Sequence, residues 1–328
     1  MTATVLGDAD LVIVHEWNAH ELVRRIGEHR TRNDYVLLFH DTHHRMVTQP
    51  DSMAAYDLSS YDGVLAYGEV LRELYEARGN VARAWTWHEA ADTRVFKPLS
   101  NIERSRDLVW VGNWGDDERT AELHEFLIEP AKELKLNARV YGVRYPSAAQ
   151  NALRDAGIDY GNWLPNFEAP RVFAEFKLTV HVPRRPYVKT LPGIPTIRPF
   201  EALACGIPLI CSPWNDAEQL FRPGTDYLIA RDGAEMKQHM RAVLIEPQLA
   251  AELARNGLET IRKRHTCAHR VDELLKIYDE LKGSARVPRA VDGVPPSASS
   301  DSLETNVAAG RSNEHARRVR SPKQEVVA

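Results

Sequence analysis

The feature that most constrains the fold of this chain is a series of short, continuously apolar segments that alternate with helical patterns. Eight of these segments lie at residues 11–14, 35–39, 63–67, 82–87, 108–112, 138–143, 178–182 and 208–212. They are rich in β-branched and aromatic residues and show no polar alternation, which is typical of strands buried on both faces. The intervening stretches, such as ELVRRIGEH and AELHEFLIEPAKEL, have the period of amphipathic helices. The pattern predicts an α/β fold of parallel strands covered by helices.

Polar side chains follow most of the predicted strands. The polar runs are HEWN (15–18), HDTHHR (40–45), HE (88–89), NWGDD (113–117) and PRR (183–185). In open α/β sheets, ligands bind beyond the carboxyl ends of the strands. Two successive groups of strands with polar ends therefore predict two domains that face one cleft.

Composition suggests where the parts of the chain meet. We expect an N-terminal domain at residues 1–98 and a second domain at 105–265, with the seam in KPLSNIERSRD (97–107). A helical pattern follows at 266–282. Residues 283–328 contain no aromatic residue and no isoleucine, so they cannot bury enough apolar surface to offset their ordering entropy, and we predict a disordered tail.

Charge and cysteine content exclude several classes of protein. The net charge of −4 and the pI near 6.4 give no electrostatic reason to expect nucleic acid or an anionic membrane as the main partner. The three cysteines form no C-x-x-C pair, which favours reduced thiols and a cytoplasmic protein. The N-terminal stretch has no basic region and only a four-residue apolar run, so we expect neither a signal peptide nor a transmembrane segment.

The segment RPFEALACGIPLICS (198–212) contains an unusual acidic residue. Pro199 suits the first turn of a helix and Gly206 its end, and Glu201 is the only polar residue between them. One interpretation is that Glu201 complements the helix dipole. The other is that Arg198 and Glu201 present a cation and a hydroxyl acceptor to a phosphorylated ligand, because a helix N-terminus is a ready site for phosphate.

Two stretches resemble a known family. LPNFEAPRVFAEFKLTVHVPR and GIPTIRPFEALACGIPLICSPWNDAEQLFRPGTDYLIARDGAEM resemble the donor-binding domain of GT-B glycosyltransferases, most closely the CgeB-like branch of the group-1 (GT4-type) enzymes. The resemblance covers residues 105–282, and VHEW, FHDTHHR and WHEAADTRVF resemble the same branch less specifically. It implies two Rossmann-like domains facing a cleft, with residues 266–282 as a helix that packs back on the N-terminal domain.

The same resemblance implies an activity. We expect transfer of a sugar from a nucleoside-diphosphate sugar to an unknown acceptor, with retention of configuration and with no metal or other cofactor. The family's helix glutamate contacts the ribose hydroxyls, and that role falls on Glu201. Arg198 is expected to neutralise the diphosphate, and Asn113, Arg144 and Arg184 complete the candidate donor-binding residues.

The sequence departs from the family in two places. The first glutamate of the family's E-x7-E motif is replaced by Gly193, so we expect sugar contacts from the main-chain N–H groups of Gly193 and Ile194. The chain also begins almost at a strand that usually follows a glycine-containing loop, which gives an apparently shortened N-terminal domain. Both departures favour an alternative, a non-catalytic nucleotide- or glycan-binding protein.

The HDTHHR run contains the candidate catalytic residues. Related enzymes place a histidine against the donor sugar at this strand end, which makes His40 the candidate, and Asp41 and Glu89 are candidate catalytic carboxylates. Packing and loop capping are the structural alternative for the histidines. The HDTHH cluster is also competent to bind a metal, which would suggest a metal-dependent hydrolase, but its spacing matches no common zinc or two-metal pattern, so we expect no metal site.

Overall fold

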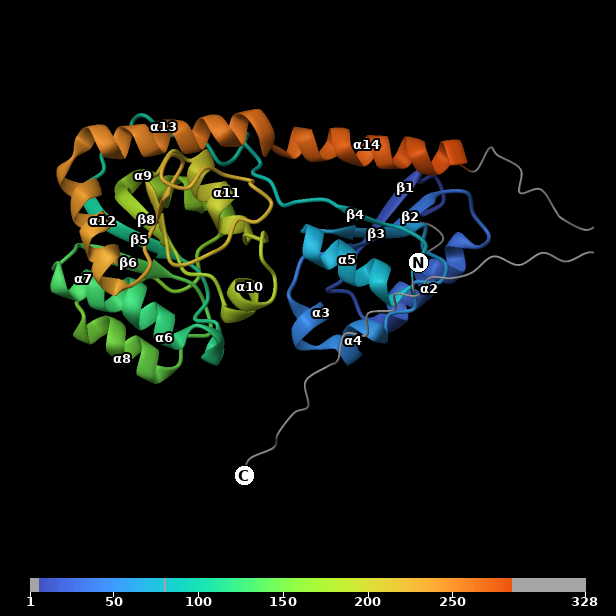
Figure 1. Ribbon diagram of the computed structural model, residues 1–328, viewed down its shortest axis with the longest axis horizontal. Coiled ribbons are helices and arrows are strands. Elements are labelled where there is room, and N and C mark those ends of the chain that lie inside the picture. The colour runs from blue at the N-terminus through green and yellow to red at the C-terminus, as the bar shows by residue number, and fades with distance from the viewer. Residues whose placement is uncertain (1–5, 80, 285–328) are drawn as a thin grey trace, which may run out of the picture. The chain divides into compact units, whose positions relative to one another are not determined.

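The structure is a computed structural model that describes residues 6–79 and 81–284. Within these residues, the strands form two sheets in which every pair of neighbouring strands is parallel (Figure 1). One sheet has the order β1-β2-β3-β4 and the other the order β10-β9-β8-β5-β6-β7. The predicted α/β fold with two parallel-strand sheets is confirmed.

Alternate residues of each strand in the first sheet pack against helices on opposite faces. Its strands are β1 (Leu11–His15), β2 (Val36–Asp41), β3 (Gly63–Ala66) and β4 (Ala84–Thr86). In β2, Leu37 and Phe39 belong to a core shared with helices α2 to α5, whereas Val36 and Leu38 pack with Ile277 of α14 (Cys267–Ser284). Burial on both faces explains why the strand is continuously apolar.

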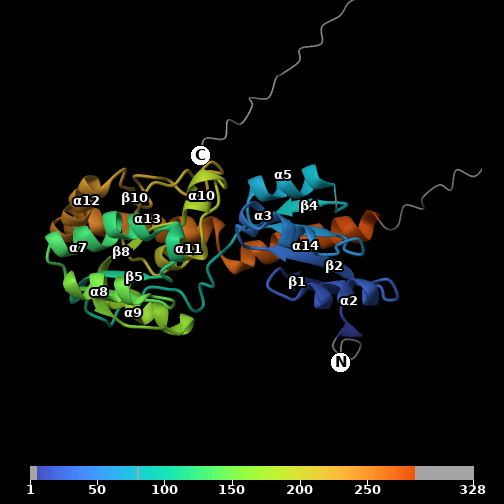
Figure 2. The ribbon, with the colours of Figure 1, turned by 90° about the horizontal axis from the view of Figure 1, so that it is seen from below.

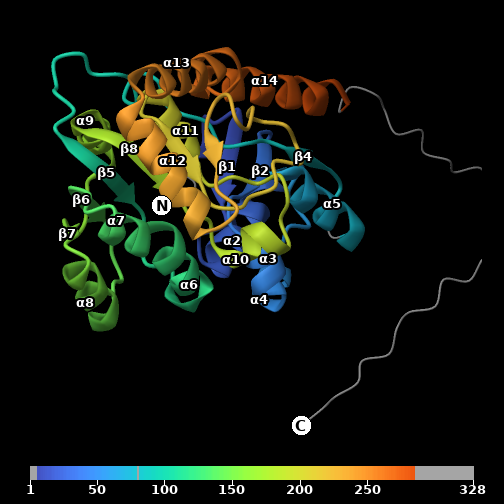
Figure 3. The same cartoon turned by 60° about the vertical axis from the view of Figure 1, so that its left-hand side comes forward.

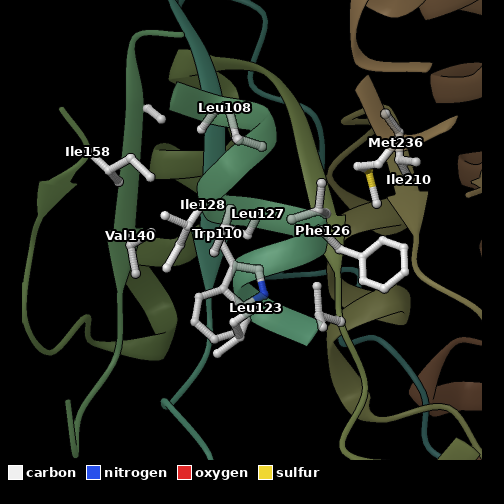
Figure 4. Packing of buried hydrophobic residues seen from close by; sticks show 14 of the residues in the cluster. Leu108, Trp110, Leu123, Phe126, Leu127, Ile128, Val140, Ile158, Ile210 and Met236 are labelled. Carbon is white, nitrogen blue, oxygen red and sulfur yellow. The ribbon is translucent and has the colours of Figure 1, made fainter. Parts of the chain in front are cut away.

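The second sheet is built in the same way. Its strands are β5 (Arg106–Val111), β6 (Ala138–Tyr141), β7 (Asp159–Tyr160), β8 (Phe176–His181), β9 (Leu209–Cys211) and β10 (Leu228–Ile229). Leu108 and Trp110 of β5 point into one buried cluster, which Figure 4 shows, and Val109 and Val111 point into another. Burial on both faces fixes the register of the sheet, because a slip of one residue would move the side chains of each buried cluster to the opposite face of the sheet.

The helices that cover the sheets can be followed in Figures 1 and 2. Those of the first part are α2 (His20–Arg30), α3 (Arg45–Thr48), α4 (Pro50–Ala54) and α5 (Glu69–Arg78). Those of the second part are α6 (Thr120–Leu123), α7 (Glu129–Glu133), α8 (Ser147–Asp155), α9 (Ala169–Glu175), α10 (Arg185–Lys189), α11 (Ile197–Ala204), α12 (Gly233–Ile245) and α13 (Pro247–Arg264). Helix α13 packs on α11 and α12, as Figure 3 shows.

The structure adds elements that the sequence pattern missed. Strands β7 and β10 have two residues each and lie at the two edges of the second sheet, so they carry no periodic signal. Gly283 and Ser284, expected to begin a disordered tail, are the last residues of helix α14. The rest of the predicted tail, residues 285–328, lies outside the described residues.

Candidate functional site

Glu201 lies in the first turns of α11 and is almost completely buried. Thr196 adopts an extended conformation before the helix, and Gly206 follows it with a φ of +64°, which suits glycine at a helix end. The side chain of Glu201 is 3% exposed, and one of its carboxylate oxygens accepts a hydrogen bond of 3.0 Å from Asn166 Nδ2. Burial raises the pKa of Glu201 above its ordinary value.

Arg198 binds Glu201 directly. Its Nη1 lies 2.5 Å from Glu201 Oε2, and the Arg198 side chain is 21% exposed. The guanidinium therefore neutralises the buried carboxylate instead of presenting a free charge. The two residues are brought together as expected, but as an ion pair, and their roles toward a ligand stay predictions.

Asn113 and Arg119 fix the turn after β5. Asn113 Oδ1 accepts a hydrogen bond of 3.1 Å from the backbone N–H of Val143, which joins the ends of β5 and β6. Arg119 donates to the carbonyl oxygens of Asn113 (2.5 Å) and Val182 (2.8 Å). Burial lowers the pKa of Arg119 to about 10, so the guanidinium stays charged at neutral pH. A fixed positive charge therefore lies beneath the carboxyl ends of β5 and β8.

Arg144 is exposed at the end of β6 and has a left-handed φ of +61°. It borders a pocket of about 490 Å³ at the carboxyl edge of the second sheet. The lining residues are Trp114, Asp117, Arg144, Tyr145 and Pro146. Arg144 thus borders a hollow at the edge where the sheet topology predicts ligand binding, whereas the Asn113 side chain is held by the backbone N–H of Val143.

Arg184 is engaged elsewhere. Its Nη1 lies 2.8 Å from Glu118 Oε2, and the Nε2 atom of His44 lies 3.5 Å from the same oxygen. Glu118 therefore links a cation that follows β8 to a histidine of the HDTHH run. The expected contact between Arg184 and a donor requires that this ion pair be exchanged.

The main-chain groups of Gly193 and Ile194 already have partners. Gly193 N–H donates to the carbonyl of Asn215 at 2.8 Å, and Ile194 N–H donates to that of Leu191 at 3.3 Å. The side chain of Ile194 is fully buried in the core of the first sheet. These contacts do not favour the expected main-chain binding of the sugar, which stays a prediction.

Glu218 occupies the space that the glycine leaves. A Cβ atom on Gly193 would lie 2.7 Å from Glu218 Cγ, and the φ of Gly193 is +86°, so the position suits only glycine. The Glu218 carboxylate lies 2.6 Å from His88 Nε2 and accepts a hydrogen bond of 2.9 Å from the backbone N–H of Glu69. A carboxylate therefore does reach this region, but from a position 25 residues further along the chain.

His40 and Asp41 lie at the carboxyl end of β2 in different environments. The His40 ring contacts those of His15 and Trp87 at centroid distances of 5.3 and 4.9 Å, and burial lowers its pKa to about 4. Asp41 is fully buried and accepts hydrogen bonds from Tyr75 Oη at 2.9 Å and from the backbone N–H of His43 at 3.1 Å. Burial raises its pKa to about 6. The catalytic roles stay predictions, and the environment of Asp41 favours a structural one.

The HDTHH run does not form a metal site. Asp41 points to Tyr75, and His44 Nδ1 lies 3.0 Å from Thr48 Oγ1. Within residues 6–79 and 81–284, no group of three or more His, Cys, Asp or Glu side chains is arranged to hold a metal ion. Asp41 and His44 are thus turned toward different partners, and the hydrolase alternative stays a prediction.

Sequence reasoning missed Asn166 and Glu218. Asn166 follows β7 and holds Glu201, and Glu218 follows β9 and holds His88. Their roles depend on partners 35 and 130 positions away in the sequence, and no local pattern marks such pairs. The replacement of the family's glutamate by Gly193 was a sign in the sequence that another side chain, here Glu218, fills this space. A glycine with a left-handed φ leaves room for a neighbouring side chain.

Comparison with known proteins agrees with this geometry. Residues 119–276 match a family described as glycosyl transferase-like. The chain is similar in structure to sucrose-phosphate synthase from Thermosynechococcus elongatus, with a TM-score of 0.65, 13% identity, and 86% of this chain and 76% of that chain covered. No curated protein sequence gives a significant match.

Two further solved structures have the same fold. HepE from Anabaena, in complex with UDP and glucose, gives a TM-score of 0.63 at 13% identity and covers 85% of this chain and 81% of that chain. The β-glucosyltransferase of phage T4 gives a TM-score of 0.59 at 13% identity, with 84% and 83% covered. The predicted GT-B fold is confirmed, and the CgeB-like branch stays a prediction. Over the part of the chain that the structure describes, no helix is both long and apolar enough to cross a membrane.

Proposed function

We propose that the protein transfers a sugar from a nucleoside-diphosphate sugar to an acceptor. The GT-B fold of the chain and the glycosyl transferase-like match of residues 119–276 support this proposal. The observation that carries the proposal is Glu201, a buried carboxylate near the start of α11. A buried acid is costly unless it is paired, and Glu201 is held by one cation and one amide. This arrangement keeps an ionisable acceptor oriented at the edge where the proposal places the donor.

The donor would be bound by Glu201 and the start of α11. In this proposal the Glu201 carboxylate accepts hydrogen bonds from the two ribose hydroxyls. The diphosphate then lies at the N-terminus of α11, where the helix dipole favours negative charge. Arg198 can turn from Glu201 toward the diphosphate because its side chain is partly exposed.

The bond that breaks joins the anomeric carbon of the sugar to the diphosphate oxygen. Negative charge develops on that oxygen, and Arg198, Arg144 and the helix dipole stabilise it. The acceptor hydroxyl attacks the anomeric carbon from the face that the diphosphate leaves, and its proton passes to the departing diphosphate oxygen as the new glycosidic bond forms. We propose that the configuration is retained and that these groups act without a metal ion.

The assignment of the two sheets follows from the same proposal. Residues 105–265 would bind the donor, residues 1–98 the acceptor, and residues 266–282 would close the structure by packing on the first sheet. His40 is then the residue of the first sheet that approaches the sugar. The cytoplasmic location, suggested by three cysteines that are free in the structure, is part of the proposal.

A non-catalytic nucleotide- or glycan-binding protein is the second candidate. It is favoured by the internal hydrogen bonds of Gly193 and Ile194 and by the complete burial of Asp41. These features reduce the number of groups that can reach a sugar without rearrangement. Both candidates bind a nucleotide, and only the first turns over a nucleotide sugar.

A thermal-shift panel followed by a turnover assay tests the proposal. The purified chain is melted with UDP, GDP, ADP and TDP, and with Mg²⁺ and Zn²⁺ alone. A nucleotide at about one hundred times its dissociation constant should add about 2.7 kcal/mol to the stability of the folded state. HepE was solved with UDP, so UDP is the first nucleotide to test. Release of nucleotide from the matching nucleotide sugar separates the enzyme from the binding protein, and no response to any nucleotide contradicts both.

A further inference from the structure

Trp17 is a large aromatic side chain that remains exposed at the carboxyl end of β1. It follows the strand by two residues, and it is 61% exposed. Isolated exposed apolar residues are common and need no explanation. Trp17 differs from them because three neighbouring side chains hold it in position.

Arg45 and His43 fix the orientation of the indole. The Arg45 guanidinium carbon lies 4.4 Å from the centre of the Trp17 ring, and the His43 ring lies 4.9 Å away at an interplanar angle of 72°. The Trp17 backbone N–H donates to Nδ1 of His15 at 3.3 Å. We refer to Trp17, Arg45 and His43 as the Trp17 platform. Because its contacts form before any ligand arrives, little side-chain entropy is left to lose on binding.

Glu16 anchors the platform from the protein interior. Arg45 Nη2 donates to the backbone carbonyl of Glu16 at 2.7 Å and pairs with its carboxylate, which is fully buried. The charge of Arg45 is therefore matched by that of Glu16. Burial lowers the pKa of His43 to about 4, so this imidazole is neutral at pH 7. The platform has no excess charge that would select an anion.

The platform continues into the candidate catalytic edge. His15 and His40 are register partners on β1 and β2, and their rings lie 5.3 Å apart. His15 also accepts a hydrogen bond from the Trp17 backbone N–H, so one histidine contacts both the main chain of Trp17 and the ring of His40. A group bound on Trp17 would thus lie at the same pair of strand ends as the residue proposed to approach the sugar.

We propose that the Trp17 platform is an acceptor subsite for a carbohydrate ring. The apolar C–H face of a pyranose stacks on the exposed indole, and its hydroxyls meet the polar groups of His43 and Arg45 beside it. A lipid tail would need a continuous apolar surface, whereas an imidazole and a guanidinium contact this ring. An anionic ligand would need an unpaired cation, and Arg45 is paired. The inference rests on the proposed function, in which the first sheet binds the acceptor, and it makes that acceptor a glycan.

Binding of defined disaccharides tests the inference. Maltose, cellobiose, lactose and N,N′-diacetylchitobiose are titrated to about 10 mM, a range suited to weak sites, against the full chain with UDP present. The same titrations are made on Trp17→Ala, Trp17→Phe and Trp163→Ala. Trp163 is the matched control because it is 68% exposed and lies after β7 in the second sheet. Dodecylphosphocholine serves as the lipid-like probe.

At least one disaccharide should bind the wild-type chain. Trp17→Ala should bind it about fivefold to tenfold more weakly, Trp17→Phe should retain most of the affinity, and Trp163→Ala should match the wild type. All variants should melt close to the wild type because both side chains are exposed.

Three results would overturn the inference. They are the absence of disaccharide binding to the wild type, equal binding by Trp17→Ala, and loss of binding in Trp163→Ala instead. Preferential binding of the lipid-like probe at Trp17 would also reject a glycan. UDP binding is measured in the same samples, so failure of the proposed donor site is seen separately from failure of the platform.

Discussion

Replacing Glu201 separates its proposed role in binding from a purely structural role. Hydrogen bonds to a charged group contribute about 1.5–3 kcal/mol, and those between neutral groups about 0.5–1.5 kcal/mol. If the carboxylate accepts the ribose hydroxyls, Glu201→Ala should weaken nucleotide binding by about 10- to 150-fold. Glu201→Gln keeps one acceptor oxygen and should lose about fivefold to tenfold.

Glu201→Gln should have little effect on the stability of the fold. Burial raises the pKa of Glu201, so the folded state disfavours the ionised carboxylate, and stability falls as pH rises above the ordinary value of 4.5. Glutamine carries no charge and avoids this loss, and Arg198, which is 21% exposed, can be hydrated when its partner is removed. We expect a stability change within about 1 kcal/mol at pH 7.

Calorimetric titration with the nucleotide from the thermal-shift panel, together with melting curves, provides the measurement. Glu259→Gln is the matched control, because Glu259 is an exposed glutamate on α13, which packs against α11. This control should change neither affinity nor melting. Wild-type affinity in both Glu201 variants, combined with a clearly lower melting temperature, would refute the binding role and leave Glu201 as a residue that complements the helix dipole.

Two further predictions concern buried charges. Burial and the nearby charge of Glu201 raise the pKa of Glu89 to about 7, so the folded state keeps a proton that the unfolded chain loses above pH 4.5. The free energy of unfolding should therefore fall by about 1–3 kcal/mol from about pH 5 to about pH 8. Denaturant titrations at several pH values measure this slope, and Glu89→Gln should reduce it. An unchanged slope would contradict the raised pKa of Glu89. Arg119→Met removes the donor to three carbonyl oxygens and should lower the free energy of unfolding by about 3 kcal/mol. Arg171→Met is the control, because the Arg171 side chain is 76% exposed, and it should change the stability by no more than about 0.5 kcal/mol. Similar losses of stability in both variants would show that the hydrogen bonds of Arg119 add no stability.

Much of the fold could be predicted because its signals are local. Each of the eight predicted strands is a run of apolar residues, and the structure contains a parallel strand at every one of them. Strands β7 and β10 escaped prediction because two residues at the edge of a sheet carry no period. The helix that carries Glu201 and its end at Gly206 were likewise readable from the sequence, although α11 begins at Ile197, two residues before the Pro199 at which we expected it to start.

The candidate site was only partly predictable. The sequence identified Glu201 and Arg198 as neighbours on one helix, but it did not indicate that they form an ion pair with each other. It marked Gly193 as a departure and did not reveal that Glu218 fills the adjacent space. It gave no weight to Trp17, whose exposure and support by Arg45 are visible only in three dimensions.

The sequence by itself determined the order of strands and helices, the parallel sheets and the helix that carries Glu201. These features depend on the spacing of apolar residues and on helix-end signals, which act over a few neighbouring positions. Only the tertiary structure decided which polar groups meet, such as Asn166 with Glu201 and Glu218 with His88. Those residues follow different strands of the sheets, and the chain brings them together only when the parallel strands align their carboxyl ends.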